Sequence, residues 1–79
     1  MSFDVEVVVT LKAPPTEAMM NELDHRFEVA GHEAGTKTVE LIEHVSIADE
    51  ADAIAFVRSL VLEAIPQNAV ITSIVAVPG

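Results

Sequence analysis

The sequence has no cysteine, no tryptophan and no tyrosine. Without cysteine, the chain can form neither disulfides nor thiolate metal sites. Its three phenylalanines are scattered and do not make the aromatic platform on which proteins stack single-stranded nucleic acid. A chain of 79 residues buries only about 60% of its unfolded surface. Its stability therefore has to come from an apolar core, from a partner, or from both.

Basic residues are also scarce, with 4 Lys and Arg against 13 Asp and Glu and a net charge of −9. Such a charge repels phosphate backbones and anionic membranes, so we expect neither nucleic acid nor a membrane as partner. Apolar runs such as 7–9 and 60–62 are too short to cross a bilayer, and the N-terminus lacks the basic segment of a signal peptide. We therefore expect one cytoplasmic domain over residues 1–79.

The chain is nevertheless 51% hydrophobic, chiefly through Val, Ile and Ala. The regular period of these residues argues against a disordered chain, despite the acidity and the low aromatic content. In a small protein, an excess of apolar residues is typical of a surface that is buried between subunits. The composition thus favours a folded domain that associates with itself or with another protein.

Alternating and β-branched segments predict four strands, at residues 3–11, 27–32, 37–47 and 70–77. The first strand alternates cleanly, with Phe3, Val5 and Val7 on the same face. The second strand contains few apolar residues and is expected at a sheet edge, with a loop over 27–35 as the alternative. A turn around Gly35 would join the second and third strands.

Two helices are predicted between these strands, over about 15–26 and about 49–65. Pro15 suits the first turn of the first helix. In the second, Asp49 can accept a hydrogen bond as the N-cap, and Pro66 ends the helix. Ala53, Val57 and Val61 lie on an apolar stripe at helical spacing.

The resulting order of strand, helix, strand, strand, helix, strand resembles the ferredoxin-like arrangement, an α+β fold. Right-handed crossovers would place the strands in the order fourth, first, third, second, with both helices on one face. Small domains of this shape include amino-acid-sensing ACT domains, metal-carrying domains, acylphosphatases and dimeric monooxygenase-like barrels. The Ala-, Val- and Glu-rich composition is also similar to that of small proteins of high-GC bacteria and their phages.

The loop after the first strand departs from the motifs of these families. It is Lys12-Ala13-Pro14-Pro15. ACT domains usually carry a glycine there, metal-carrying domains a Cys-x-x-Cys and acylphosphatases an anion-binding arginine, and this loop has none of them. The resemblance therefore implies a fold and no particular activity.

Apolar residues interrupt the face of the sheet that the helices would leave open. Val8 and Ile42 fall there on the two central strands, where polar residues are expected. One of two sets from the last strand must join them, and these sets are Val70, Ile74 and Ala76, or Ile71, Val75 and Val77. The predicted interface residues are Val8, Ile42, His44, Ile74 and Val75. We expect two copies to meet through these faces, with pairing of edge strands or docking of a different protein as alternatives.

Glu43 is an anomaly in the third strand, because alternation places it on the core face between Leu41 and Val45. It is the candidate for a carboxylate with a perturbed pKa and a functional role. The interpretation that we favour is a glutamate at the edge of the core, whose carboxylate reaches water past a helix end.

No catalytic, cofactor or metal motif is present. His25, His32 and His44 are spaced by seven and twelve residues, which matches no ligand pattern. We therefore expect no enzyme activity, no cofactor and no bound metal. The expected function is that of a small acidic protein-interaction module that forms homodimers.

Two alternatives stay open. One is an ACT-like small-molecule sensor or a small enzyme that uses Glu43 and His44. The other is an acidic decoy for a nucleic-acid-binding protein, which the spread of the carboxylates over the whole surface disfavours.

Overall fold

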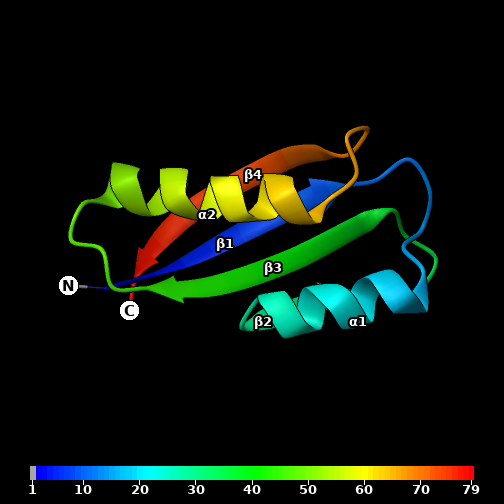
Figure 1. Cartoon of the computed structure of the whole chain (residues 1–79), viewed down its shortest axis with the longest axis horizontal. Helices are drawn as coiled ribbons and strands as arrows, with labels where there is room; N and C mark the ends of the chain where they lie inside the picture. Colours follow the sequence, from blue (N-terminus) through cyan, green and yellow to red (C-terminus); the bar gives the residue numbers. More distant parts are fainter. Residues whose placement is uncertain (1) are drawn as a thin grey trace.

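The computed structural model describes residues 2–79, which form one antiparallel sheet and two helices (Figure 1). The elements are β1 (Phe3–Thr10), α1 (Glu17–Arg26), β2 (Val29–His32), β3 (Thr38–Val45), α2 (Glu50–Ala64) and β4 (Val70–Pro78). The strands lie in the order β2-β3-β1-β4, and every neighbouring pair is antiparallel. The predicted ferredoxin-like topology is confirmed.

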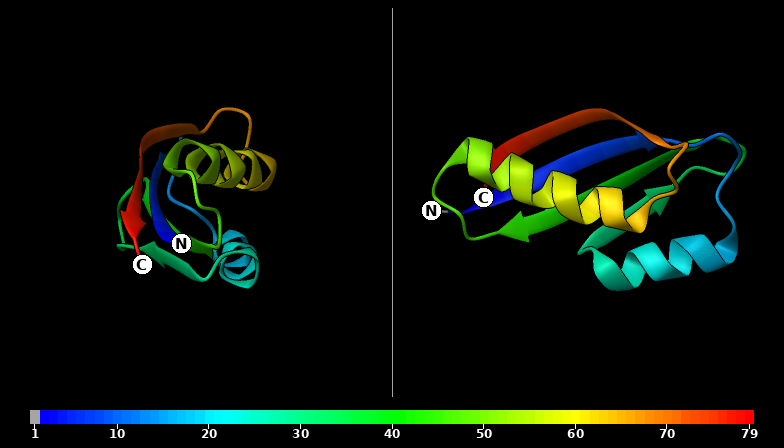
Figure 2. Two further views of the ribbon diagram at one scale, coloured as in Figure 1. Left: turned by 90° about the vertical axis from the view of Figure 1, so that its left-hand side faces the viewer. Right: turned by 45° about the horizontal axis from the view of Figure 1, so that its top comes forward.

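Both helices cover the same face of the sheet and leave the other face open (Figure 2). Helix α1 lies beside β2, and α2 lies over β1 and β4. The two ends of the described chain are joined, because the Gly79 N–H donates to the Ser2 carbonyl at 3.2 Å and the Ser2 hydroxyl donates to the Gly79 carbonyl at 2.7 Å.

The core fills the space between the sheet and the helices. Five sheet residues are 0–1% exposed, and these are Val5, Val7, Val9, Val39 and Leu41. Equally buried helix residues pack against these sheet residues, and they are Leu23 of α1 and Ala53, Val57 and Val61 of α2. Period two in the strands and period 3.6 in the helices bring these side chains to one layer. Burying each large one is worth about 1.5–3 kcal/mol relative to leaving it exposed.

Side-chain caps set the first residue of each helix. Asp49 accepts a hydrogen bond from the Asp52 N–H at 3.0 Å, as predicted for α2. In α1 the cap is Thr16, whose hydroxyl accepts from the Met19 N–H at 3.1 Å. The predicted start at Pro15 is therefore two residues too early, because the extended backbone of a cap residue precedes the first helical turn.

Segment 27–35, for which the sequence allowed either a strand or a loop, contains a short strand. Phe27 caps the C-terminus of α1 and is buried in the core, so β2 begins only at Val29. Gly35 takes a φ of 84° in the turn before β3, a conformation that side chains with a Cβ rarely adopt. The loop alternative for this segment is wrong.

A β-bulge divides β4. Val8 pairs with Ser73 and Val9 with Ile71, so Thr72 is an extra residue, and its hydroxyl donates to the Val8 carbonyl at 3.1 Å. Because a bulge restarts the alternation, neither predicted set stays together. The residues on the covered face are Ile71, Ile74 and Ala76, and those on the open face are Val70, Val75 and Val77. The prediction that Ile74 belongs to the open face is wrong for this reason.

Candidate interaction surfaces

The open face carries most of the exposed apolar side chains among the described residues. The pairing of the strands arranges its central residues in two rows, Val29–Ile42–Glu6–Val75 and Gly31–Glu40–Val8–Ser73. Six large hydrophobics within residues 2–79 are clearly exposed, and these are Val29, Val70, Val75, Val77, Phe56 and Leu62. Four of these six are the valines, and all four lie on the open face. The predicted members Val8 and Ile42 lie there too, half-buried.

Carboxylates share the centre of this face with the aliphatic residues. Glu6 pairs with Ile42, and Glu40 pairs with Val8, so the two glutamates are diagonal neighbours on the central strands. Both are exposed, and Asp4 lies on the same face beside them. Two copies that met face to face would bring these charges together away from water, which is unfavourable without cations between them.

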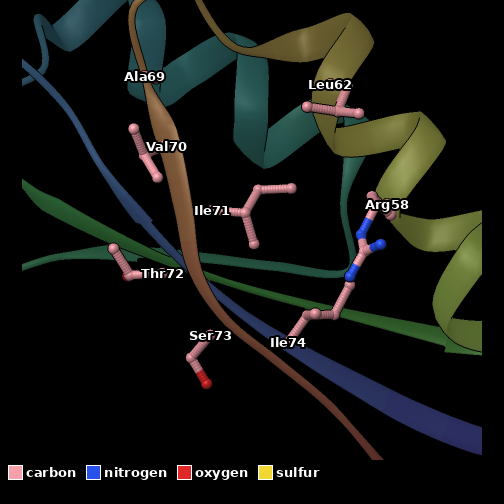
Figure 3. Close-up of a pocket in the computed structure, with 8 residues that line it drawn as sticks. All are labelled: Arg58, Leu62, Ala69, Val70, Ile71, Thr72, Ser73 and Ile74. Carbon is pink, nitrogen blue, oxygen red and sulfur yellow. The ribbon is translucent and has the colours of Figure 1, made fainter.

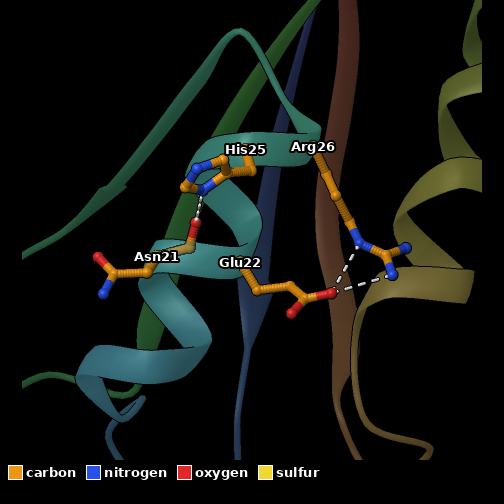
Figure 4. Close-up of polar contacts among 4 residues, drawn as sticks. All are labelled: Asn21, Glu22, His25 and Arg26. Carbon is orange, nitrogen blue, oxygen red and sulfur yellow. Dashed lines mark hydrogen bonds and ion pairs between the residues drawn. The ribbon is translucent and has the colours of Figure 1, made fainter.

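His44 lies on the open face, opposite Asp4 on β1. Its Nδ1 is 2.8 Å from the Asp4 Oδ1, and both side chains are half-exposed. This contact gives one of the carboxylates of the open face a hydrogen-bonding partner. The other two histidines lie elsewhere, with the Nδ1 of His25 2.7 Å from the Asn21 carbonyl (Figure 4) and the Nδ1 of His32 3.1 Å from the Thr38 carbonyl. No group of metal-binding side chains occurs within residues 2–79.

Glu43 has a structural partner. It lies half-buried opposite Val5, on the covered side of β3. Its Oε1 accepts a hydrogen bond from the Glu28 N–H at 3.1 Å, in the short link between α1 and β2. The carboxylate thus ties this link to β3.

The free edge of β4 is a second exposed surface, and the sequence reasoning gave it little weight. In the described part of the chain, β4 pairs only with β1, so no strand of this part lies along its other edge. Its nine residues include no charged side chain, and no Asp, Glu, Lys or Arg follows Glu63. This long uncharged segment, in a chain with a net charge of −9, was the signal that could have identified the surface.

The direction of the backbone N–H groups along β4 follows from alternation. The Gly79 N–H points at β1, so those of Val77 and Val75 do as well, and those of Ala76 and Ile74 point outward. The hydrogen bond from the Leu11 N–H to the Lys37 carbonyl gives the same result. It shows that the N–H groups of odd-numbered residues of β1 point toward β3, so those of even-numbered residues point toward β4. Pro78, which has no N–H, falls at an outward position, as prolines in edge strands do.

A groove runs along this edge. It has a volume of about 500 Å³ and lies between α2 and the first half of β4, with Arg58 and Leu62 facing residues 69–74 across it (Figure 3). Leu62 is 57% exposed. Arg58 forms no ion pair with any residue in 2–79, whereas Arg26 on α1 binds Glu22 at 3.1 Å (Figure 4).

The protein is thus a ferredoxin-like α+β domain with an open sheet face and one long uncharged edge. Comparisons with protein-family models, with curated proteins and with solved structures gave no match. Neither α1 nor α2 is long and apolar enough to span a membrane.

Proposed function

We propose that this chain is a non-enzymatic protein-interaction module that binds its partner by strand addition along the free edge of β4. The observation that supports this proposal is an edge strand of nine residues without any charged side chain. Exposed edges are templates for pairing, and soluble proteins usually protect them with charges, short strands or a covering element. Here the regular segment of β4, residues 73–77 after the bulge, has no charged side chain.

Strand addition uses backbone and side chains for different purposes. Main-chain hydrogen bonds supply affinity, at about 0.5–1.5 kcal/mol net for each bond, and alternate side chains supply specificity. On this edge, the outward groups of Ile74 and Ala76 are available for the main-chain bonds. The groove at Leu62 and Ile71 offers an apolar site for a side chain of the added strand.

The positions of the titratable groups support a binding role rather than catalysis. The lining of the groove includes one titratable side chain, Arg58, which cannot act alone as acid and base. Glu43 and His44, the residues of the enzyme or sensor alternative, project to opposite faces of β3. Each already has a local partner, the Glu28 N–H and the Asp4 carboxylate respectively.

Selection of peptides from a displayed library on the immobilised protein tests this proposal. Selected peptides should bind the wild-type chain and lose at least tenfold in affinity with Ala76→Pro, which removes an outward N–H from β4. Ala30→Pro is the matched control, because Ala30 is also a half-buried alanine of an edge strand, β2, on the covered face.

Amide hydrogen exchange gives a second readout of the same binding event. At a protein concentration low enough for the chain to be monomeric, the amides of Ile74 and Ala76 should become protected when a selected peptide is added. Peptides that are equally sensitive to both proline variants, or that protect β2 instead, would overturn strand addition at β4.

A further inference from the structure

We infer that the strand added to β4 is the β4 of a second copy, so that two chains form a two-fold homodimer with one continuous sheet. This inference rests on the strand-addition function proposed above. The two four-stranded sheets would join into a sheet of eight strands, with all four helices on one side.

Charge selects this surface for self-association. With a net charge of −9, two copies repel each other over most of their surfaces. The open face would bring Asp4, Glu6 and Glu40 of each copy together. By contrast, the edge of β4 has no charged residue, and the only charge among the residues lining the adjacent groove is that of Arg58, a cation. Two copies can therefore meet at this edge without bringing carboxylates into contact.

The backbone specifies the register. A two-fold axis perpendicular to the sheet makes the two β4 strands antiparallel. An axis at Val75 pairs Ile74 with Ala76 of the second copy and satisfies all the outward N–H groups of the regular segment. Shifting the axis to Ala76 would place Ile74 opposite Pro78, which lacks an N–H. Shifting it to Ile74 would place Ala76 opposite Thr72, the extra residue of the bulge.

The side chains agree with this register. The two Val75 side chains, each 47% exposed in one copy, meet at the axis on the open face. Pro78 lies on the covered face, and this register brings Pro78 of the second copy level with the bulge at Thr72, beside the groove that Leu62 borders. The apolar part of the groove, at Leu62 and Ile71, can thus receive an apolar side chain from the second copy, and each chain contributes one such side chain.

Disulfide scanning tests both the dimer and its register, because the chain has no cysteine of its own. In Val75→Cys, the cysteine should form a disulfide with the same cysteine of the second copy. Directly opposed residues of an antiparallel pair have Cα atoms close enough for a disulfide. Ser73→Cys and Val77→Cys should each fail alone, yet a mixture of these two variants should cross-link. Glu40→Cys, at the centre of the open face, is the control and should cross-link at least tenfold more slowly than Val75→Cys.

Sedimentation equilibrium of the full chain supplies the second measurement. The wild-type chain should form a dimer. Ala76→Pro should raise the dissociation constant of this dimer at least a hundredfold, and Ala30→Pro should leave it unchanged. Faster cross-linking of Glu40→Cys than of Val75→Cys would overturn the inference in favour of face-to-face association. A monomer at all concentrations without cross-links would overturn it as well. If selected peptides still bound β4 in that case, the proposed function would stand and only the identity of the partner would fall.

Discussion

The two edges of the sheet differ in almost every respect that controls strand pairing. The β2 edge is four residues long, includes Gly31 and lies between Glu28 and Glu33. The β4 edge is nine residues long, mostly β-branched and uncharged. Short length and flanking charge are ordinary protections of an edge strand. On β4 the regular segment has only a bulge before it and Pro78 after it, which limit the length of an added strand rather than prevent its addition.

The helices beside these edges differ in how many of their residues are buried in the core, and α2, on the β4 side, has more of them. Helix α1, beside β2, contributes one fully buried residue, Leu23, whereas α2 contributes Ala53, Val57 and Val61. The long edge therefore lies on the better anchored half of the domain. A binding edge benefits from this support, because a rigid strand loses less entropy when another strand pairs with it.

The largest effect is expected from Leu23→Ala, which removes the main contact of α1 with the core. Leu23 is 1% exposed, so the free energy of unfolding should fall by about 2–5 kcal/mol. Chemical denaturation at one fixed protein concentration measures this. Amide exchange should rise more in β2 than in β4, and a uniform rise would contradict the proposed difference between the two halves.

Val75→Lys and Val29→Lys form a matched pair that sharpens the comparison of the edges. Both valines are 47% exposed, lie on the open face and belong to the same row of the sheet. Lysine at Val75 should raise the dissociation constant of the dimer at least tenfold, or about 1.4 kcal/mol, because two cations would meet at the axis. Lysine at Val29 should leave the constant unchanged in sedimentation equilibrium. Equal effects would indicate that whole faces meet.

Glu43→Ala should have a smaller effect, confined to the β2 side. It removes the acceptor of the Glu28 N–H, which should cost about 1 kcal/mol of folding stability in thermal or chemical denaturation. Glu40→Ala, an exposed carboxylate on the same strand, is the control and should change stability by less than about 0.5 kcal/mol. If Glu43→Ala changed dimerisation and left stability intact, our structural interpretation of Glu43 would be wrong.

Leu62→Ala should have the smallest effect on the fold. Since Leu62 is 57% exposed, stability should change by less than about 0.5 kcal/mol. The dimer should weaken by a few-fold, because the groove loses the side chain that borders the added strand. Unchanged dimerisation in sedimentation equilibrium would exclude a role for the groove in the interface.

The elements themselves could be predicted because their signals are local. Alternation from Phe3 to Leu11 and the helical spacing of Ala53, Val57 and Val61 reflect backbone geometry that each segment carries with it. The cap at Asp49 is equally local, since its partner Asp52 lies three residues away. The order of these elements then left few arrangements that obey the handedness of crossovers.

Part of the candidate site could not be predicted in this way. Both faces of residues 70–77 are apolar, so the pattern contained no information on which face is buried. The bulge at Thr72 decided it, through the register with β1. The partner of Glu43 is a backbone N–H fifteen residues away, which becomes a neighbour only when β2 pairs with β3.

The sequence by itself thus determined the helices, the strands, their order and the acidity that makes most surfaces of this protein repel a second copy. Only the tertiary structure decided where the bulge falls in the uncharged C-terminal strand, which of its N–H groups point outward, and that a groove lies between this strand and the helix residues Arg58 and Leu62. The physical reason is that periodicity is a property of one segment, whereas a bulge and a groove depend on the strands and helices that lie beside that segment.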